Sequence, residues 1–209
     1  MKNCVIVANG DFARHSVPLN TLANADFVIA CDGACDKLYN NNFSFDVGIG
    51  DFDSIDISKF KDKNLIHIKE QDTNDLCKAF VYALNFNFKN ITILCASGLR
   101  DDHHIGNIFY LEYFIKLIEG RGVRVSIQTD FGEFFCYKGS FLQECKKGQQ
   151  ISLFSTDKNA VFTSRGLKYE IENFKFDYIF TGTLNEANGD NFEIITDDKN
   201  ILIVYLSYS

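Results

Sequence analysis

The most constraining feature of this chain is a change in hydrophobic patterning near residue 130, because it separates two kinds of secondary structure. Before that point, short apolar runs that suit buried strands alternate with polar turns and with segments of helical spacing. The expected strands are residues 4–8, 27–31, 46–49, 65–68, 91–95 and 123–127. Helices are expected up to residue 38, over residues 76–84 and from about residue 102 to 119. This alternation predicts a mostly parallel sheet with helices on its faces.

Beyond residue 130 the chain contains short β-like runs at close spacing, with no convincing helix between them. This pattern is typical of an antiparallel sandwich or barrel. The runs are residues 134–137, 151–154, 160–163, 167–171, 178–181, 192–195 and 201–206. We therefore predict an α/β fold in residues 1–131, followed by a smaller all-β, sandwich-like or barrel-like domain in residues 132–209.

Composition and charge narrow the possible partners. With 46% hydrophobic and 23% charged residues, the 209-residue chain has the composition of a soluble globular protein. Its formal net charge of -7 argues against a general affinity for nucleic acid or for an anionic membrane. It does not argue against an anionic substrate that enters with Mg²⁺, because the metal reverses the local sign of charge. Seven cysteines without paired spacing, and no export signal or membrane-length apolar run, predict a cytoplasmic protein with reduced thiols.

A motif rich in glycine and aspartate, residues 48–54, ends the third predicted strand. If the backbone continues extended, Asp51 and Asp53 project to one side while Phe52 turns the other way, into the core. Two carboxylates placed in this way can bind a hard cation such as Mg²⁺. On its own the motif is more typical of a polar turn than of a metal site, so its meaning depends on the rest of the chain.

Other acidic residues of the first half also follow a predicted strand or begin the helix after it. Because ligands collect at the carboxyl ends of parallel strands, these residues should converge on one edge of the sheet. Carboxylates brought together without a cation repel one another, so either they are spread apart as solvated caps or a metal lies among them. Arg100 at the same edge favours a functional site. The converging residues are Asp32, Asp51, Asp53, Asp75 and Asp102.

Several short motifs occur in a characteristic order along nearly the whole chain. They are Asn9-Gly10, Asp32-Gly33-Ala34, Gly50 to Ser54, Gln71 to Asp75, Gly98 to His103 with Asn107-Ile108, Gly166 to Tyr169, and Asn185-Glu186. Their order and approximate spacing resemble the signature series of thiamin pyrophosphokinases. Leu99 and Leu184 depart from the pattern, since they stand where the family has glycine and serine.

This resemblance implies that the terminal diphosphate of ATP is transferred to the hydroxyl of thiamine, giving thiamine diphosphate and AMP. It implies Mg²⁺, a homodimer, and substrate sites where the two kinds of domain meet. Residues 1–131 would then be the catalytic domain that binds ATP and Mg²⁺, and residues 132–209 the domain that binds thiamine.

The resemblance also implies roles for single residues. The metal ligands would be Asp32, Asp51, Asp53 and Asp75, and the catalytic residues Asp51, Asp53, Asp75 and Arg100. Nucleotide contacts would come from Asp32, Arg100, Asp102 and His103, and substrate contacts from Gln71, Asn185 and Glu186. Two questions stay open: whether Asp53 or Asp75 also accepts a proton, and whether His103 reaches phosphate or only caps its helix.

Two other functions are compatible with the same residues. A metal-dependent phosphohydrolase would use the carboxylates to activate water, and would consume ATP without an acceptor alcohol. A non-catalytic sensor of nucleotide or thiamine would be stabilised by its ligand without turnover.

Overall fold

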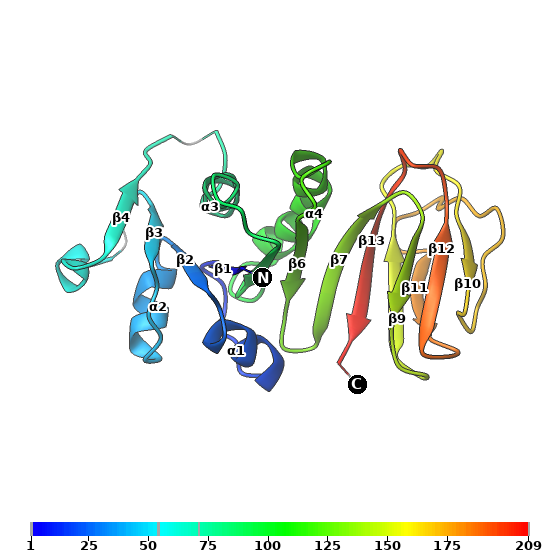
Figure 1. The fold of residues 1–209 in the computed structure, drawn as a ribbon, viewed down its shortest axis with the longest axis horizontal. Coiled ribbons are helices and arrows are strands. Elements are labelled where there is room, and N and C mark those ends of the chain that lie inside the picture. The colour runs from blue at the N-terminus through cyan, green and yellow to red at the C-terminus, as the bar shows by residue number, and fades with distance from the viewer. Residues whose placement is uncertain (1, 54, 71, 209) are drawn as a thin grey trace. The chain divides into compact units, whose positions relative to one another are not determined.

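The computed structural model describes residues 2–53, 55–70 and 72–208 of the chain. Gln71, a predicted substrate contact, lies outside these residues. The chain forms two compact units (Figure 1). The first contains residues up to Tyr110 together with Lys116–Asp130, and the second contains Leu111–Ile115 together with the residues from Phe131 onward.

The first unit is built on a parallel sheet. Its strands are β1 (Asn3–Val7), β2 (Phe27–Cys31), β3 (Val47–Gly50), β4 (Asn64–His67), β5 (Asn90–Leu94) and β6 (Arg124–Gln128). They are ordered β6-β5-β1-β2-β3-β4, and each pair of neighbours is parallel. The order reverses at β1, which has β2 on one side and β5 on the other. A reversal of this kind leaves a crevice at the carboxyl ends of the strands.

Helices cover both faces of this sheet. In Figure 1, α1 and α2 lie on one face and α3 and α4 on the other. Leu22 of α1 and Leu38 of α2 share a hydrophobic cluster with Val5 of β1 and Val28 of β2. None of the described helices is long and apolar enough to cross a membrane. The helices are α1 (Ser16–Ala23), α2 (Ala34–Asn40), α3 (Asp75–Ala83) and α4 (Asp101–Leu117), and the 3-10 helix is η1 (Ile57–Phe60).

The sequence pattern predicted α3 and missed α1. In α3, apolar residues at positions 76, 79, 80 and 83 are buried, which is the spacing of one helix face. In α1, His15 caps the first turn by accepting a hydrogen bond from Val17 N at Nδ1, over 3.2 Å. Pro18 lies in that first turn, where proline is tolerated because the backbone N–H has no helical partner. Pro18 was therefore an available signal for the start of α1.

The second unit is an antiparallel sandwich. One sheet has the order β7-β13-β9-β11, and the other β10-β12-β8. Phe192 and Ile194 of β12 are buried and alternate with the exposed Glu193, as expected for a strand with one face in a core. The fold class predicted from the sequence is thus confirmed. The strands are β7 (Gly132–Lys138), β8 (Phe141–Glu144), β9 (Gln150–Phe154), β10 (Thr163–Arg165), β11 (Gly182–Glu186), β12 (Asn191–Ile195) and β13 (Ile201–Ser207).

Two of the expected strands in this unit are wrong, and the one expected at residues 160–163 is displaced to β10 (Thr163–Arg165). Residues 167–171 form a loop, which follows Gly166 at φ +91°. Residues 178–181 form turns, in which Thr181 N donates to Tyr178 O at 3.0 Å. The side chains of Tyr178 and Phe180 are 65% and 64% exposed, so their apolar character does not mark a buried strand.

Gly10 follows β1. Its substitution by alanine tests how closely the loops pack at the carboxyl edge of the parallel sheet. A Cβ at position 10 would lie 2.2 Å from Ser97 O and 2.3 Å from Cys95 O. Gly10→Ala must force these loops apart, and we expect urea titrations to show a loss of about 1–3 kcal/mol of unfolding free energy. The control is Gly106→Ala in α4, where a Cβ meets nothing within 4 Å and should add roughly 1 kcal/mol. Equal effects would contradict the close contact.

Candidate active site

The crevice at the reversal of strand order contains a pocket of about 390 Å³. Its walls come from the segments that follow β1, β2 and β5 and from the starts of α3 and α4. Glycine lets these segments approach closely: a Cβ on Gly33 would lie 2.6 Å from the side-chain nitrogen of Asn9. The predicted site residues that line the pocket are Asp32, Asp75, Arg100 and His103.

A group of three carboxylates lies at the ends of β2 and β3. One oxygen from each of Asp32, Asp51 and Asp53 is within 4.8 Å of the other two. The backbone fixes this arrangement, since Asp32 N donates to Ile49 O at 2.8 Å. A Cβ on Gly50 would lie only 2.9 Å from the Cβ of Asp32, so the glycine permits the close contact.

The route by which Asp51 and Asp53 come together differs from the one expected. Phe52 has φ +54°, so the backbone is left-handed at this residue and not extended. The ring of Phe52 is nevertheless buried, at 9% exposure, in the cluster that contains β1 and β2. Anchoring the ring in the core leaves the flanking carboxylates on the side of Asp32.

The three carboxylates form a donor set that fits Mg²⁺. Carboxylate oxygens are the ligands that hard divalent cations prefer, and Mg²⁺ completes its shell with water and phosphate oxygens. At separations below 5 Å the three negative charges repel one another, and a bound cation removes that cost.

Asp75 lies outside this carboxylate group, although it lines the same pocket. It begins α3, and its Oδ1 accepts a hydrogen bond from Lys78 Nζ at 3.2 Å. Burial raises the pKa of Asp75; Lys78 lowers it, and the carboxylates of Asp32 and Asp51 raise it. The predicted role of Asp75 as a metal ligand stays a prediction.

Lys78, the partner of Asp75, was not identified from the sequence, and its side chain is 6% exposed. Its spacing of three residues from Asp75 was a usable signal, because residues three apart are neighbours on a helix.

Arg100 and Asp102 form an exposed ion pair at the pocket rim. Arg100 Nη2 lies 2.6 Å from Asp102 Oδ2, and Nε lies 3.1 Å from Oδ1. The pair raises the pKa of Arg100 and lowers that of Asp102. Because both side chains are more than 60% exposed, the pair contributes little to stability. A phosphate can therefore replace Asp102 as the partner of Arg100 at low cost.

The turn before Arg100 has an unusual backbone. Leu99, which stands where the family pattern has glycine, adopts φ +59°. Glycine populates this region without a steric cost, whereas a residue with a Cβ is strained there. The side chain of Leu99 is 71% exposed beside the pocket. His103 is also exposed and lines the pocket, and its contact with a nucleotide stays a prediction.

Lys37 of α2 binds the segment after β1, which lines the pocket, and was not identified from the sequence. Its Nζ donates to Asn9 O at 2.8 Å and also to Gly10 O. Burial lowers the pKa of Lys37, and the neighbouring Cys95 and Asp11 oppose that shift. The ammonium therefore holds the segment after β1 against α2. No sequence pattern revealed this contact, because both acceptors are backbone carbonyls.

In the second unit, the Asn185-Glu186 motif contacts the loop at residues 166–169. Asn185 Nδ2 donates to Tyr169 O at 2.8 Å, and Tyr169 N donates to Asn185 Oδ1 at 3.1 Å. Glu186 Oε2 accepts from Lys168 Nζ at 3.0 Å. The structure thus brings together the two motifs that were assigned to thiamine. Leu184, just before them, has φ +63° and is 81% exposed.

Comparison with known proteins identifies the family. Two protein-family models match the chain: "Thiamin pyrophosphokinase, catalytic domain" over residues 19–119 and "Thiamin pyrophosphokinase, substrate-binding domain" over residues 132–205. The chain belongs to the thiamin pyrophosphokinase family. The family expected from the sequence motifs is therefore confirmed, and with it an enzyme of the thiamine diphosphokinase type.

Individual relatives agree with this assignment. Thiamin pyrophosphokinase 1 of Caenorhabditis elegans is 23% identical over 175 residues, which cover 76% of this chain and 70% of that protein. The thiamine pyrophosphokinase structure from Bacillus subtilis matches with a TM-score of 0.82 at 23% identity, covering 99% of both chains. The thiamin pyrophosphokinase from Candida albicans matches with a TM-score of 0.84 at 17% identity, covering 100% of this chain and 89% of that one. At these identities the structural likeness establishes the fold.

Thermal unfolding with and without MgCl₂ tests the carboxylate group in this thiamin pyrophosphokinase family member. A ligand that binds only the native state stabilises it, by about 2.7 kcal/mol at a hundred times its Kd. We expect MgCl₂ to raise the Tm of the native chain, and Asp53→Asn to lose most of that increase. In EDTA the variant should be no less stable than the native chain, because one of three repelling charges is removed.

Asp62→Asn is the matched control, since Asp62 is an exposed acidic residue of the same unit outside the carboxylate group. It should keep the full increase in Tm with MgCl₂. An equal increase in Asp53→Asn and in the native chain would contradict the metal assignment.

Proposed function

We propose that the chain transfers the terminal diphosphate of ATP to the hydroxyl of thiamine, giving thiamine diphosphate and AMP in a Mg²⁺-dependent reaction. Family membership supports the formation of thiamine diphosphate. The observation that carries the finer proposal is the group formed by Asp32, Asp51 and Asp53, because Asp32 also lines the pocket that Arg100 borders.

The residues of the first unit suit the charge of a triphosphate. Transfer of a phosphoryl-type group requires neutralised phosphate charge and an acceptor oxygen held in line, with little covalent work for the protein. Asp32, Asp51 and Asp53 would hold Mg²⁺, and the bound ion would offset the charge on the phosphate oxygens. Arg100 presents a planar fork of donors that pairs with two phosphate oxygens, which an ammonium group cannot reproduce. Asp102 and His103, beside Arg100, are the further proposed nucleotide contacts.

The acceptor hydroxyl must lose a proton as its oxygen forms the new bond to phosphorus. A carboxylate near the pocket takes this proton, and Asp53 and Asp75 are the candidates. Asp75 lines the pocket and is held by Lys78, so its position is fixed independently of a metal. Asp53 is exposed and belongs to the carboxylate group, where a bound metal would occupy its oxygens. We therefore favour Asp75 as the proton acceptor.

We assign thiamine recognition to the second unit. Thiamine carries a cationic thiazolium ring, and aromatic faces attract cations. The ring of Tyr169 is 61% exposed, while its backbone N–H and carbonyl are both bonded to Asn185. A fixed backbone with an exposed ring is suited to presenting an aromatic surface to a ligand. Glu186, the other residue of the Asn185-Glu186 motif, is a further proposed substrate contact, and its carboxylate pairs with Lys168 at 3.0 Å.

The proposal includes a homodimer, as the resemblance implies, and a cytoplasmic location, as the unpaired cysteine spacing predicts. Light scattering of the purified chain would test the dimer. No observation favours the phosphohydrolase or the sensor over the kinase, and both become outcomes of the assay below.

An assay of products tests the proposed reaction. The chain is incubated with MgCl₂ and ATP, with or without thiamine, and the nucleotides and thiamine esters are separated. We expect AMP and thiamine diphosphate in equal amounts, and only when all three components are present. ADP or phosphate released without thiamine would indicate a phosphohydrolase. Stabilisation by ligands without any product would indicate a sensor, and either result would contradict the proposal.

Asp53→Asn provides the matched negative variant in this assay, with Asp62→Asn as its control. Loss of a metal ligand should lower the rate of AMP formation at least about 100-fold, while the variant remains folded in EDTA. Asp62→Asn should form AMP at the native rate. A near-native rate in Asp53→Asn would show that the carboxylate group does not hold the catalytic metal.

A further inference from the structure

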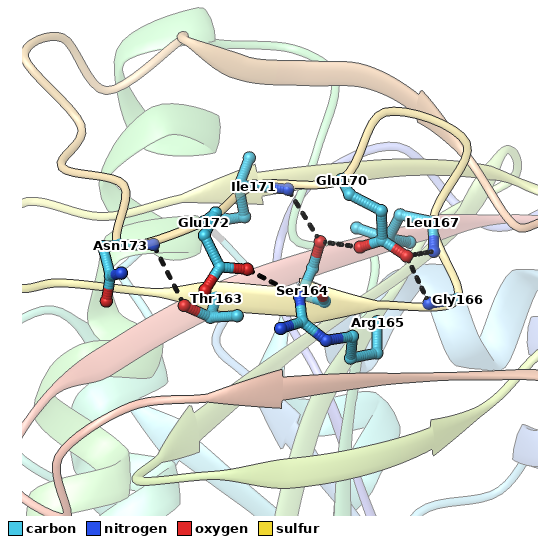
Figure 2. A network of polar contacts seen from close by, with 9 residues as sticks. All are labelled: Thr163, Ser164, Arg165, Gly166, Leu167, Glu170, Ile171, Glu172 and Asn173. Atoms are coloured by element: carbon cyan, nitrogen blue, oxygen red, sulfur yellow. Dashed lines mark hydrogen bonds and ion pairs between the residues drawn. The ribbon is translucent and has the colours of Figure 1, made fainter.

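The loop of residues 166–169 in the second unit is closed at its base by side chains of β10 (Figure 2). Ser164 is 0% exposed; its N–H donates to Ile171 O at 2.9 Å, and its Oγ accepts from Ile171 N at 3.0 Å. Thr163 Oγ1 accepts from Asn173 N at 3.0 Å. The segment that returns along β10 is therefore held by side-chain hydrogen bonds in addition to backbone ones.

Glu170, an exposed residue directly after this loop, turns its carboxylate back toward the loop backbone. Oε1 accepts hydrogen bonds from Gly166 N at 2.6 Å and from Leu167 N at 3.2 Å. Oε2 accepts a hydrogen bond from Ser164 Oγ, as Figure 2 shows. Successive backbone N–H groups that point at one anion form an anion-binding nest, and hydrogen bonds to a charged acceptor are the stronger ones. Here the anion is the side chain of Glu170, the residue that directly follows the loop.

The tip of the loop is fixed from the opposite side. Lys168 N donates to Glu186 O at 2.8 Å, and the backbone of Tyr169 is bonded to the side chain of Asn185. Glu170 thus holds the start of the loop, while the Asn185-Glu186 motif fixes its tip. The side chains of Lys168 and Tyr169 remain exposed between these two supports.

We propose that Glu170 is a positioning residue for thiamine recognition, acting through the geometry of loop 166–169 without touching the substrate. The inference rests on the proposed function, which places thiamine at this loop. It adds a residue that neither the sequence motifs nor the proposed substrate contacts include.

The expected effect of removing the Glu170 carboxylate depends on the fraction of molecules in which loop 166–169 has the conformation that binds thiamine. Without the carboxylate, the N–H groups of Gly166 and Leu167 bind water, and the loop samples other conformations. If the binding conformation falls to about a tenth of the population, the apparent affinity for thiamine falls about tenfold. The affinity for ATP, which we assign to the first unit, should not change.

Steady-state kinetics of Glu170→Ala and Glu172→Ala test this role. Glu172 lies two residues away and pairs with Arg165 at 2.8 Å, but both side chains are more than half exposed, and Glu172 does not contact the N–H groups of Gly166 or Leu167. We expect Glu170→Ala to raise the KM for thiamine about tenfold, with kcat and the KM for ATP within twofold of native. Glu172→Ala should leave all three values within about twofold, as for other exposed ion pairs.

Glu170→Gln is the conservative variant. Its amide oxygen can still accept from Gly166 N and Leu167 N but carries no charge, so the KM for thiamine should lie between the native and Glu170→Ala values. An unchanged KM for thiamine in Glu170→Ala, or an equal increase in both KM values, would overturn the proposal.

Hydrogen exchange separates this inference from the proposed function. In the native chain the amides of Gly166 and Leu167 should be protected, and in folded Glu170→Ala they should exchange at least about tenfold faster. The amide of Phe162, which donates to Phe174 O at 2.9 Å, is the internal reference. Absence of activity in the native chain would refute the proposed function itself. Activity together with unchanged exchange at Gly166 and Leu167 would refute only the role of Glu170.

Discussion

The repulsion among Asp32, Asp51 and Asp53 is the physical constraint on which the candidate active site depends. Three carboxylates do not gather in water by themselves; the backbone of the first unit forces them together. Asp32 at φ +41° is bonded to Ile49, and Phe52 at φ +54° has its ring in the core. Strained residues of this kind cost of order 1–3 kcal/mol each and persist only where the surrounding structure holds them. The core of the first unit therefore maintains a group of carboxylates whose mutual repulsion a divalent cation would remove.

Each unit stabilises a loop near the proposed binding residues by giving its backbone groups a side-chain partner of opposite charge. In the first unit, the ammonium of Lys37 binds the carbonyls of Asn9 and Gly10. In the second, the carboxylate of Glu170 binds the N–H groups of Gly166 and Leu167. Backbone groups in loops lack the partners that helices and sheets supply, so a charged side chain satisfies them where the loop must keep one shape.

The sequence predicted the parts of the fold that follow from periodicity and the parts of the site that follow from topology. The gathering of Asp32, Asp51 and Asp53 was predictable, because each follows a strand of one parallel sheet. Lys37 was not, since its partners are carbonyl groups 27 and 28 positions earlier in the chain. The expected strand at residues 178–181 failed because Tyr178 and Phe180 are exposed, and exposure cannot be read from hydrophobicity alone. The left-handed backbone at Phe52 was equally invisible to a pattern of residue types.

Anomalous diffraction from crystals soaked in MnCl₂ tests the central claim most directly, because Mn²⁺ accepts the same oxygen ligands as Mg²⁺ and can be located by its own scattering. The account predicts an anomalous peak within coordinating distance of the carboxylates of Asp32, Asp51 and Asp53, and its loss in crystals of Asp53→Asn. A peak at other carboxylates with none at this group, or an unchanged peak in Asp53→Asn, would contradict it.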